Sequence, residues 1–115
     1  SNNLFSIIYS NNFPVAYIKL VKNTTNQNIQ STNVCKLERL YILNDFIAQK
    51  IGSIAMDYIL EKANELKFKE LWLAVYKENT KAIKFYQRNG FSKVGNIIFK
   101  VGESDFDNYV LSKKL

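Results

Sequence analysis

Apolar and polar residues alternate along the first third of the chain in a way that predicts three strands. Two apolar runs, 4–9 and 15–21, flank a turn sequence rich in Ser, Asn and Pro, which is typical of an antiparallel hairpin. Residues 23–33 are almost entirely Asn, Thr, Gln and Ser, so we expect a mobile polar loop that adds nothing apolar to the core. Residues 34–42 alternate imperfectly, which indicates a strand that contains a bulge and pairs with the hairpin.

The middle of the chain switches to helical spacing. Apolar residues recur every three or four positions over 51–66, which predicts an amphipathic helix. Its predicted apolar stripe comprises Ile51, Ile54, Ala55, Tyr58, Ile59, Ala63 and Leu66. The continuously apolar run 71–75 is typical of a strand covered on both faces, with Trp72 in the core. Asn79 and Gly90 are suited to cap the start and the end of a second helix.

The last quarter of the chain predicts a second hairpin. A glycine turn at 94–96 precedes an apolar run at 97–101, and an acidic turn at 102–107 leads into a final alternating run at 109–115. The element order is therefore three strands, a helix, a strand, a helix and two strands, with a right-handed crossover between parallel strands. This order predicts a single α/β domain over residues 1–115, with a mixed sheet and two main helices.

Composition excludes several kinds of chemistry. The sequence has no His and one Cys, which rules out a His-based catalytic triad, a Cys–His pair, an ordinary zinc site and a haem-ligating His within one chain. Cys35 cannot form an internal disulfide, and no apolar run approaches the roughly 20 residues of a membrane span. We therefore expect a soluble, cytoplasmic protein without a metal, in which any catalysis uses carboxylates, Tyr, Lys, Ser or backbone groups.

The charge balance points to anionic partners. A net charge of +6 and a pI near 9.4 favour nucleic acid, an acidic membrane surface or a phosphorylated small molecule. The basic residues are dispersed, and no aromatic RNA-binding motif or zinc finger accompanies them, so nucleic acid is not the partner we expect. Residues 42–53 join a strand to a helix and would present backbone N–H groups at a helix N-terminus, which is a natural seat for a phosphate.

Three motifs carry a resemblance to a known family: LERLYI at 37–42, QKIGS at 49–53 and NTKAIKFYQRNGF at 79–91. The third is the most specific, because an Asn cap, an Ala, a Phe-Tyr pair and a Gly-Phe exit recur together at this spacing. From the second strand of that fold to its end, the chain resembles the GNAT superfamily of N-acetyltransferases. The tail, residues 91–115, is also similar to the ending of bacterial GNAT enzymes related to spermidine/spermine acetyltransferases.

The resemblance implies a site for acetyl-CoA between two splayed parallel strands, 37–42 and 71–75, and acetyl transfer to a primary amine of a small molecule or polypeptide. It places the thioester arm along the first strand, the pyrophosphate over 47–53, and the thiol end between Asn79 and Tyr86. The cofactor contacts that it implies are Leu40, Tyr41, Ile42, Ile47, Ala48, Gln49, Lys50, Ile51, Gly52, Ser53, Asn79 and Tyr86.

The same resemblance assigns the acid and the base of a direct transfer. Glu38 is the candidate base for the acceptor ammonium, and Tyr86 is the candidate acid for the departing thiolate. Each also fits an ordinary structural role, Glu38 as a salt-bridged surface carboxylate and Tyr86 as a core aromatic with a solvated hydroxyl. Lys81, Lys84 and Arg88 lie near one face of the second helix, where they either meet the CoA phosphates or form a solvated charged row.

The chain departs from the family pattern in its phosphate loop. That loop normally reads Gln/Arg-x-x-Gly-x-Gly/Ala, whereas residues 47–52 read Ile-Ala-Gln-Lys-Ile-Gly, so only Gly52 is retained. Lys50 replaces the inner glycine, which adds a Cβ where the backbone approaches phosphate but keeps the amide and adds a cation.

The chain also starts late relative to the family. The first strand and the two helices after it, which help to wall the acceptor pocket, have no counterpart before Leu4, so the resemblance implies an N-terminally truncated acyl-CoA N-acyltransferase fold. A fragment, a cloned piece and a natural short form that borrows the wall from a partner all remain open. We expect a homodimer, because the absent strand would leave an exposed sheet edge. The rival functions are a catalytically degenerate CoA-binding or structural module and a nucleic-acid binder.

Overall fold

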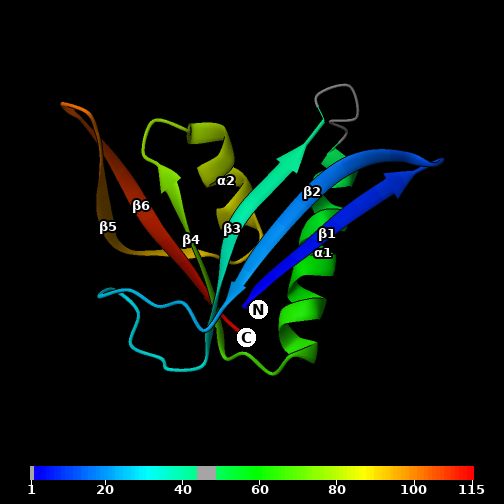
Figure 1. The fold of residues 1–115 in the computed structure, drawn as a ribbon, viewed down its shortest axis with the longest axis horizontal. Coiled ribbons are helices and arrows are strands. Elements are labelled where there is room, and N and C mark those ends of the chain that lie inside the picture. Colours follow the sequence, from blue (N-terminus) through cyan, green and yellow to red (C-terminus); the bar gives the residue numbers. More distant parts are fainter. Residues whose placement is uncertain (1, 44–48) are drawn as a thin grey trace.

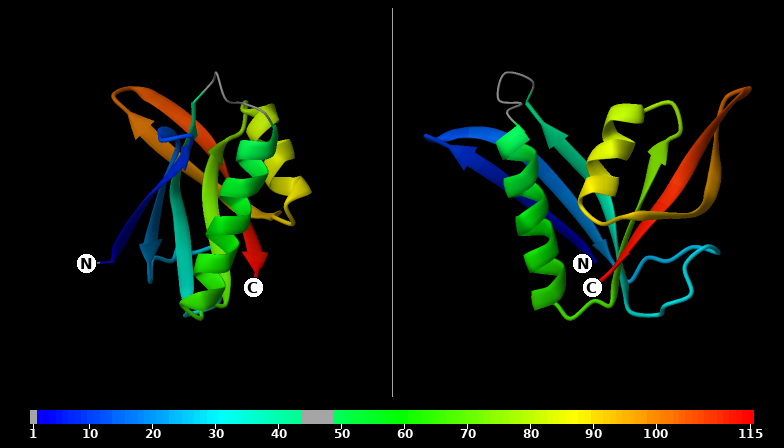
Figure 2. Two further views of the ribbon diagram at one scale, coloured as in Figure 1. Left: turned by 90° about the vertical axis from the view of Figure 1, so that its right-hand side faces the viewer. Right: turned by 180° about the vertical axis from the view of Figure 1, so that it is seen from behind.

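A computed structural model describes residues 2–43 and 49–115 of the chain. Its elements are β1 (Asn3–Ser10), β2 (Phe13–Lys22), β3 (Val34–Ile42), α1 (Gln49–Glu65), β4 (Glu70–Tyr76), α2 (Thr80–Arg88), β5 (Ser92–Val101) and β6 (Ser104–Lys114). The strands form one mixed sheet in the order β1-β2-β3-β4-β6-β5, and both helices lie on the side that faces the viewer in the right panel of Figure 2 (Figures 1 and 2). The predicted element order and α/β class are confirmed.

The bulge predicted in the third strand is confirmed and has a defined position. β2 and β3 pair antiparallel, with Lys19 opposite Arg39 and Leu20 opposite Leu37. Glu38 is therefore an extra residue on β3, and the two residues 38 and 39 oppose a single residue of β2.

The two parallel strands pair over a short distance only. β3 and β4 are joined at Val34–Glu70, Cys35–Leu71 and Lys36–Trp72, and they diverge beyond these pairs (Figure 1). β4 stays paired with β6 along its whole length. The sheet therefore consists of two halves, β1-β2-β3 and β4-β6-β5, that are joined at one end and open at the other, as expected for splayed strands.

The buried stripe of α1 differs from the predicted one. Its fully buried side chains are Ala55, Met56, Ile59 and Ala63, which pack on the strands together with half-buried residues of α2. Ile54 and Tyr58 lie at the border of the stripe and are 52% and 37% exposed. Spacing alone located the helix but placed the centre of its buried face incorrectly, because Met56 was left out of the stripe.

The polar loop at 23–33 contributes to the core, contrary to prediction. Ile29 is buried against Val34, Trp72 and Val110 on the sheet face opposite the helices. The indole N–H of Trp72 donates a hydrogen bond to the carbonyl of Thr24 at 2.6 Å, so the loop is attached to the sheet at two points. One isoleucine in eleven residues was too weak a signal to identify this contact.

A buried carboxylate also fastens this loop to the joined end of the sheet. Glu70 on β4 accepts hydrogen bonds from Ser31 of the loop at 2.8 Å, from Lys114 of β6 at 2.7 Å and from Ser112 of β6. Burial alone would raise the pKa of Glu70, but these hydrogen bonds and the positive charge of Lys114 outweigh it and lower the pKa. The carboxylate therefore stays ionised at neutral pH and links the loop, β4 and β6.

The turn predicted at 94–96 is wrong. β5 runs through these residues, with a register shift between Lys93 and Gly95 that leaves Val94 as a bulge. Glycine within a strand marks a bulge or a close approach of another group. Here a Cβ on Gly95 would meet the side chain of Asn28. The chain reverses at Gly102, where φ is +63°, at the start of the acidic turn predicted over 102–107, but β6 already begins at Ser104, so that turn is shorter than predicted.

The C-terminal cap predicted at Gly90 is confirmed. Gly90 has φ of +93°, and its N–H donates to the carbonyl of Gln87 at 3.0 Å. The N–H of Phe91 donates to the carbonyl of Tyr86 at 3.1 Å, and the two rings pack edge to face with centroids 5.7 Å apart. This pattern is a Schellman motif with its hydrophobic contact, so the helix end fixes the orientation of Tyr86.

We expect Gly90→Ala to destabilise the fold more than Gly102→Ala. Both positions have a positive φ, which costs an L-residue about 1–2 kcal/mol. A Cβ at position 90 would in addition meet the end of the Lys113 side chain, whereas position 102 has open space around it. Urea unfolding of both variants measures the difference, and equal midpoints would show that moving the end of Lys113 aside costs nothing beyond the backbone strain that the two positions share.

We expect part of the stability to be lost between pH 9 and pH 11 because of Cys35. Burial raises the pKa of this thiol to about 11, against an ordinary value near 9. Between these values the unfolded chain has lost the proton that the folded chain keeps, so the free energy of unfolding falls as pH rises, by about 1.4 kcal/mol at pH 10. Cys35→Ala should lower stability at every pH but reduce this slope in urea unfolding, leaving the contribution of Tyr86, whose pKa is also raised by burial. An unchanged slope would contradict the assignment.

Candidate functional site

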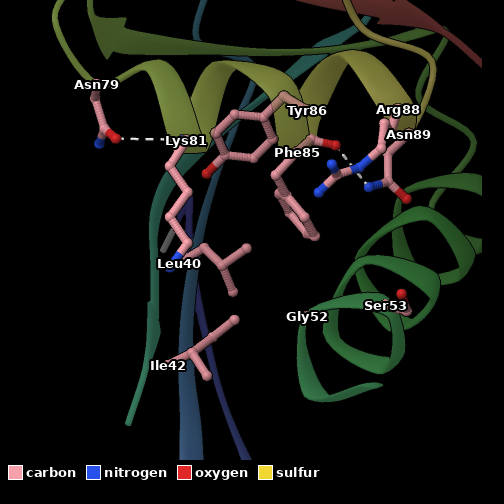
Figure 3. Close-up of a pocket in the computed structure, with 11 residues that line it drawn as sticks. Leu40, Ile42, Gly52, Ser53, Asn79, Lys81, Phe85, Tyr86, Arg88 and Asn89 are labelled. Carbon is pink, nitrogen blue, oxygen red and sulfur yellow. Dashed lines mark hydrogen bonds between the residues drawn. The ribbon is translucent and has the colours of Figure 1, made fainter. Parts of the chain in front are cut away.

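A cavity of about 710 Å³ lies between β3, the first turn of α1 and one face of α2 (Figure 3). Its lining residues are Leu40, Ile42, Gly52, Ser53, Asn79, Lys81, Ala82, Phe85, Tyr86, Arg88 and Asn89. The cavity therefore occupies the open end of the sheet, where β3 has left β4.

Apolar side chains form the wall between the two helices. Leu40 and Ile42 project from β3 into the cavity, and Phe85 projects from α2 toward Gly52 (Figure 3). A Cβ on Gly52 would lie 3.0 Å from the ring of Phe85, so glycine is the residue that lets the ring pack against α1. The retained glycine of the sequence motif thus has a packing role in this structure.

The start of α1 is an electropositive part of the site. The first N–H groups of a helix have no acceptor within the helix and carry partial positive charge. The first turn of α1 contains no acidic residue, and it carries Lys50, whose charge is unfavourable at this end unless an anion is near. Gly52 and Ser53, at the end of that turn, line the cavity.

Two cations of α2 also belong to the cavity. Lys81 and Arg88 line it and project from opposite ends of the helix, whereas Lys84 is not part of the lining (Figure 3). Neither Lys81 nor Arg88 forms an ion pair with any residue in the described part of the chain. Of the three basic residues predicted to share this face, the structure brings two to the site.

Tyr86 presents its hydroxyl to the cavity. The side chain is half-buried between Phe85 and Phe91, with ring centroids at 5.3 and 5.7 Å, and Figure 3 shows the hydroxyl directed toward Lys81 and Leu40. Burial raises the pKa of Tyr86 to about 12, so the hydroxyl keeps its proton at neutral pH. Among the described residues it has no hydrogen-bond partner, which leaves it available to a ligand.

Asn79 has a structural role at the edge of the same cavity. Its side-chain oxygen accepts a hydrogen bond from the backbone N–H of Ala82 at 3.2 Å, which confirms the predicted N-terminal cap. The cap holds the first turn of α2 in place beside the cavity.

Several predicted site residues do not place their side chains in the cavity. Tyr41 is 63% exposed and lies opposite Tyr17 on the other face of the sheet. The side chains of Lys50 and Ile51 are not part of the lining, and Gln49 is the first residue of α1. The predicted contacts of Ile47 and Ala48 fall outside the described residues.

Glu38 is also outside the cavity. Its carboxylate forms an ion pair with Lys36, with 3.0 Å between Nζ and Oε2. The residue is exposed at the bulge, close to the last pair of β3 and β4. This ion pair agrees with the structural role that the sequence left open, and the position beside the divergence of the strands agrees with the catalytic one.

The cavity also includes residues that were not among the predicted site residues, although the third motif contains them. Phe85, Asn89 and Ala82 lie on the same face of α2 as Tyr86, and the side chain of Asn89 donates to the carbonyl of Phe85 at 2.8 Å. Positions three and four apart on a helix share a face, so the spacing from Tyr86 would have identified Ala82 and Asn89.

The residues present fit an elongated ligand with an anionic end. The start of α1, Lys81 and Arg88 supply positive charge, and Leu40, Ile42 and Phe85 supply an apolar passage. Beyond Lys36, the described part of β3 has no hydrogen-bonded strand on its β4 side, so its backbone groups are open to an extended partner. Within the described residues no helix is long and apolar enough to cross a bilayer, and no three potential metal ligands cluster.

The family model and the curated relatives that match this chain point to the same family. The family model described as the acetyltransferase (GNAT) family matches residues 1–91. An uncharacterized N-acetyltransferase of Lactobacillus delbrueckii subsp. lactis is 28% identical over 86% of this chain and 57% of its own length. One from Mycobacterium tuberculosis H37Rv is 28% identical over 70% of this chain and 51% of its own length. The chain thus spans about half the length of these curated relatives.

Solved structures share the fold at low sequence identity. A GNAT family acetyltransferase from Elizabethkingia anophelis, with acetyl-CoA bound, has a TM-score of 0.80 at 15% identity, covering 99% of this chain and 77% of its own. The PaiA N-acetyltransferase of Thermoplasma acidophilum, in complex with coenzyme A, has a TM-score of 0.71 at 23% identity, covering 99% and 62%. With the family model matching most of its length, the chain belongs to the acetyltransferase (GNAT) family.

Proposed function

We propose that this protein is an N-acetyltransferase that binds acetyl-CoA in the cavity beside α2 and transfers the acetyl group to a primary amine of a small molecule or polypeptide. The observation that carries the proposal is the combination of a cationic helix start with an apolar passage, at the point where β3 and β4 diverge. Two proteins of the same fold contain acetyl-CoA or coenzyme A, which supports this choice of ligand.

The proposed binding residues form two groups, one for the phosphates of CoA and one for its pantetheine arm. The phosphates of CoA belong near the backbone N–H groups at the start of α1, where helix ends attract anions, with Arg88 as a further cationic contact. The pantetheine arm belongs along β3 at Leu40 and Ile42, where it takes the place of an adjacent strand and uses the free backbone groups.

The transfer needs a proton acceptor, a proton donor and a polarised carbonyl. When bound, acetyl-CoA supplies a thioester whose acetyl carbon is attacked by the amine as the C–N bond forms and the C–S bond breaks. Glu38 takes the proton that the acceptor ammonium must lose before attack. Tyr86 holds a proton at neutral pH and donates it to the departing thiolate, and free backbone N–H groups of β3 polarise the carbonyl.

A second candidate function is a CoA-binding module without turnover. It is favoured by the ion pair between Glu38 and Lys36, because the carboxylate of the candidate base is already engaged by a cation. This module would bind acetyl-CoA as the enzyme does but would release no CoA with any primary amine in a broad panel.

We expect the chain to bind acetyl-CoA saturably in calorimetric titration, and more weakly at higher salt because the phosphate contacts are screened. Arg88→Gln should weaken binding by about tenfold, since one charge-assisted contact is lost. Lys84→Gln is the matched control, because it removes a cation from the same helix outside the cavity lining. No binding by folded protein, or equal losses in both variants, would contradict the assigned site.

We expect Tyr86→Phe to lower turnover about 100-fold while leaving acetyl-CoA affinity within a factor of about three. The substitution keeps the ring packing against Phe85 and Phe91 and removes only the proton donor. Because the pKa of Tyr86 is about 12, ionisation of its hydroxyl should not limit the rate below about pH 11. Thiol release measured across pH with a panel of primary amines tests both points, and unchanged turnover would remove Tyr86 from the mechanism.

A further inference from the structure

One primary amine, that of Lys81, is present among the described residues that line the cavity. The lining also contains two hydroxyl groups, those of Ser53 and Tyr86. Burial raises the pKa of Tyr86 to about 12, so its hydroxyl stays neutral and is a weak nucleophile. Ser53 belongs to the start of α1, where the phosphates of the proposed ligand lie. Lys81 is therefore the side chain of the cavity whose chemistry suits attack on a thioester.

The side chain of Lys81 is directed at the reacting end of the cavity. Figure 3 shows it extending from α2 toward Leu40 of β3, with the hydroxyl of Tyr86 directed toward both residues. Arg88 projects from the other end of α2, on the side of Ser53. The proposed pantetheine arm lies along Leu40 and ends with its thiol beside Tyr86, so the amine of Lys81 and the thioester share one part of the cavity.

The position of Lys81 is unfavourable for a positive charge. No acidic side chain is present among the residues that line the cavity, and Lys81 forms no ion pair within the described part of the chain. Lys81 lies in the first turn of α2, which also contains no acidic residue. Positive charge is disfavoured at the start of a helix. Acetylation removes the charge of a lysine, so the modified side chain fits this position better than the charged one.

We propose that Lys81 is an acetylation site and that the protein modifies it with the acetyl group of acetyl-CoA bound in the same cavity. This inference rests on the proposed function, because it uses the same donor and the same site. It adds an activity, self-acetylation, that needs no separate acceptor and therefore no acceptor pocket. The products are an acetylated Lys81 and one molecule of CoA.

The step is an aminolysis of the thioester. The ammonium of Lys81 loses a proton to water, and the amine then attacks the acetyl carbon, so that the C–N bond forms as the C–S bond breaks. The nitrogen gives a second proton to water, and Tyr86 donates one to the departing thiolate and recovers one from water. Because amine and thioester are held in one cavity, the attack is intramolecular within the complex and has a high effective concentration. The reaction consumes its own nucleophile, so it stops after one acetyl group per chain.

Mass spectrometry of the full chain after incubation with acetyl-CoA, without added amine, tests the proposal. We expect one acetyl group per chain, located at Lys81 by peptide mapping and added at least tenfold faster than at Lys84. Lys84 is the matched control, because it is an exposed lysine of the same helix outside the cavity lining. Equal rates at the two lysines, or no modification of Lys81, would overturn the proposal.

Two further measurements show whether the bound donor is responsible. Acetyl phosphate carries an acetyl group without CoA, so it should modify Lys81 and Lys84 at rates within threefold of each other. A tenfold preference for Lys81 with acetyl phosphate would contradict the proposal, because it would reflect a reactive lysine and not a bound donor. The rate per chain with acetyl-CoA should be independent of protein concentration, and a rate that rises in proportion to it would rule out transfer within one cavity.

Substitutions assign the roles of the two side chains. Lys81→Arg keeps the charge and removes the acceptor, so it should abolish the selective modification, whereas Lys84→Arg should leave it within twofold. Lys81 is exposed, so its variant retains the core. Tyr86→Phe should slow acetylation of Lys81 about 100-fold, because the ring packing remains and the proton donor is lost. An undiminished modification in Lys81→Arg, or an unchanged rate in Tyr86→Phe, would refute the step as proposed.

Calorimetry with acetyl-CoA separates this inference from the proposed function. If acetyl-CoA binds and Lys81 stays unmodified, self-acetylation is wrong and the acetyl-CoA site stands. If the folded chain binds no acetyl-CoA, the proposed function fails, and self-acetylation from this cavity fails with it. If Lys81 is acetylated but no primary amine in a broad panel is, self-acetylation stands alone and transfer to a separate amine fails.

Discussion

The short parallel pairing of β3 and β4 is the constraint on which the rest of this structure depends. Three residue pairs join the strands at one end, where buried side chains and the carboxylate of Glu70 hold the sheet together. Past Lys36 the strands part, and the backbone of β3 loses its neighbour on that side. Because unpaired backbone groups are costly when they are buried, such an opening is stable where water or a ligand supplies the missing partners.

The packing of α2 determines the shape of that opening. Phe85 packs on Gly52 of α1, and Tyr86 packs on Phe91, the last residue of the Schellman motif. No residue of α2 is fully buried, so the helix is held by its caps and by one partly buried aromatic face. A helix of nine residues has little stability of its own, and the contacts that order it are the same ones that line the cavity.

Much of the fold follows from the sequence because local signals and burial agree. The strand pattern, the caps at Asn79 and Gly90 and the bulge in β3 each have a local cause that the sequence displays. Predictions that depended on long-range contacts were less accurate. Ile29 is buried by Trp72, 43 positions away in the chain, and Gly95 lies under Asn28 in a strand where local rules place a turn.

Predictions of the candidate site also depended on whether the signal was local. The motifs located the strand, the helix start and Tyr86, because those residues lie close to a backbone signal. They did not predict that Lys81 and Arg88 would line the cavity while Lys84 would not, because that depends on how α2 is rotated against β3. The ion pair of Glu38 with Lys36 also depends on the geometry of the bulge.

The bulge has a consequence for insertions and deletions in β3. With a regular pleat and the same sequence, every residue after 38 would exchange faces, and Leu40 and Ile42 would leave the cavity. A strand shortened by Glu38 alone would restore simple alternation and keep each later side chain on its present side. The additional residue is therefore unnecessary for register, and its contribution is a second charged side chain beside Arg39 at a place where a regular strand has room for one.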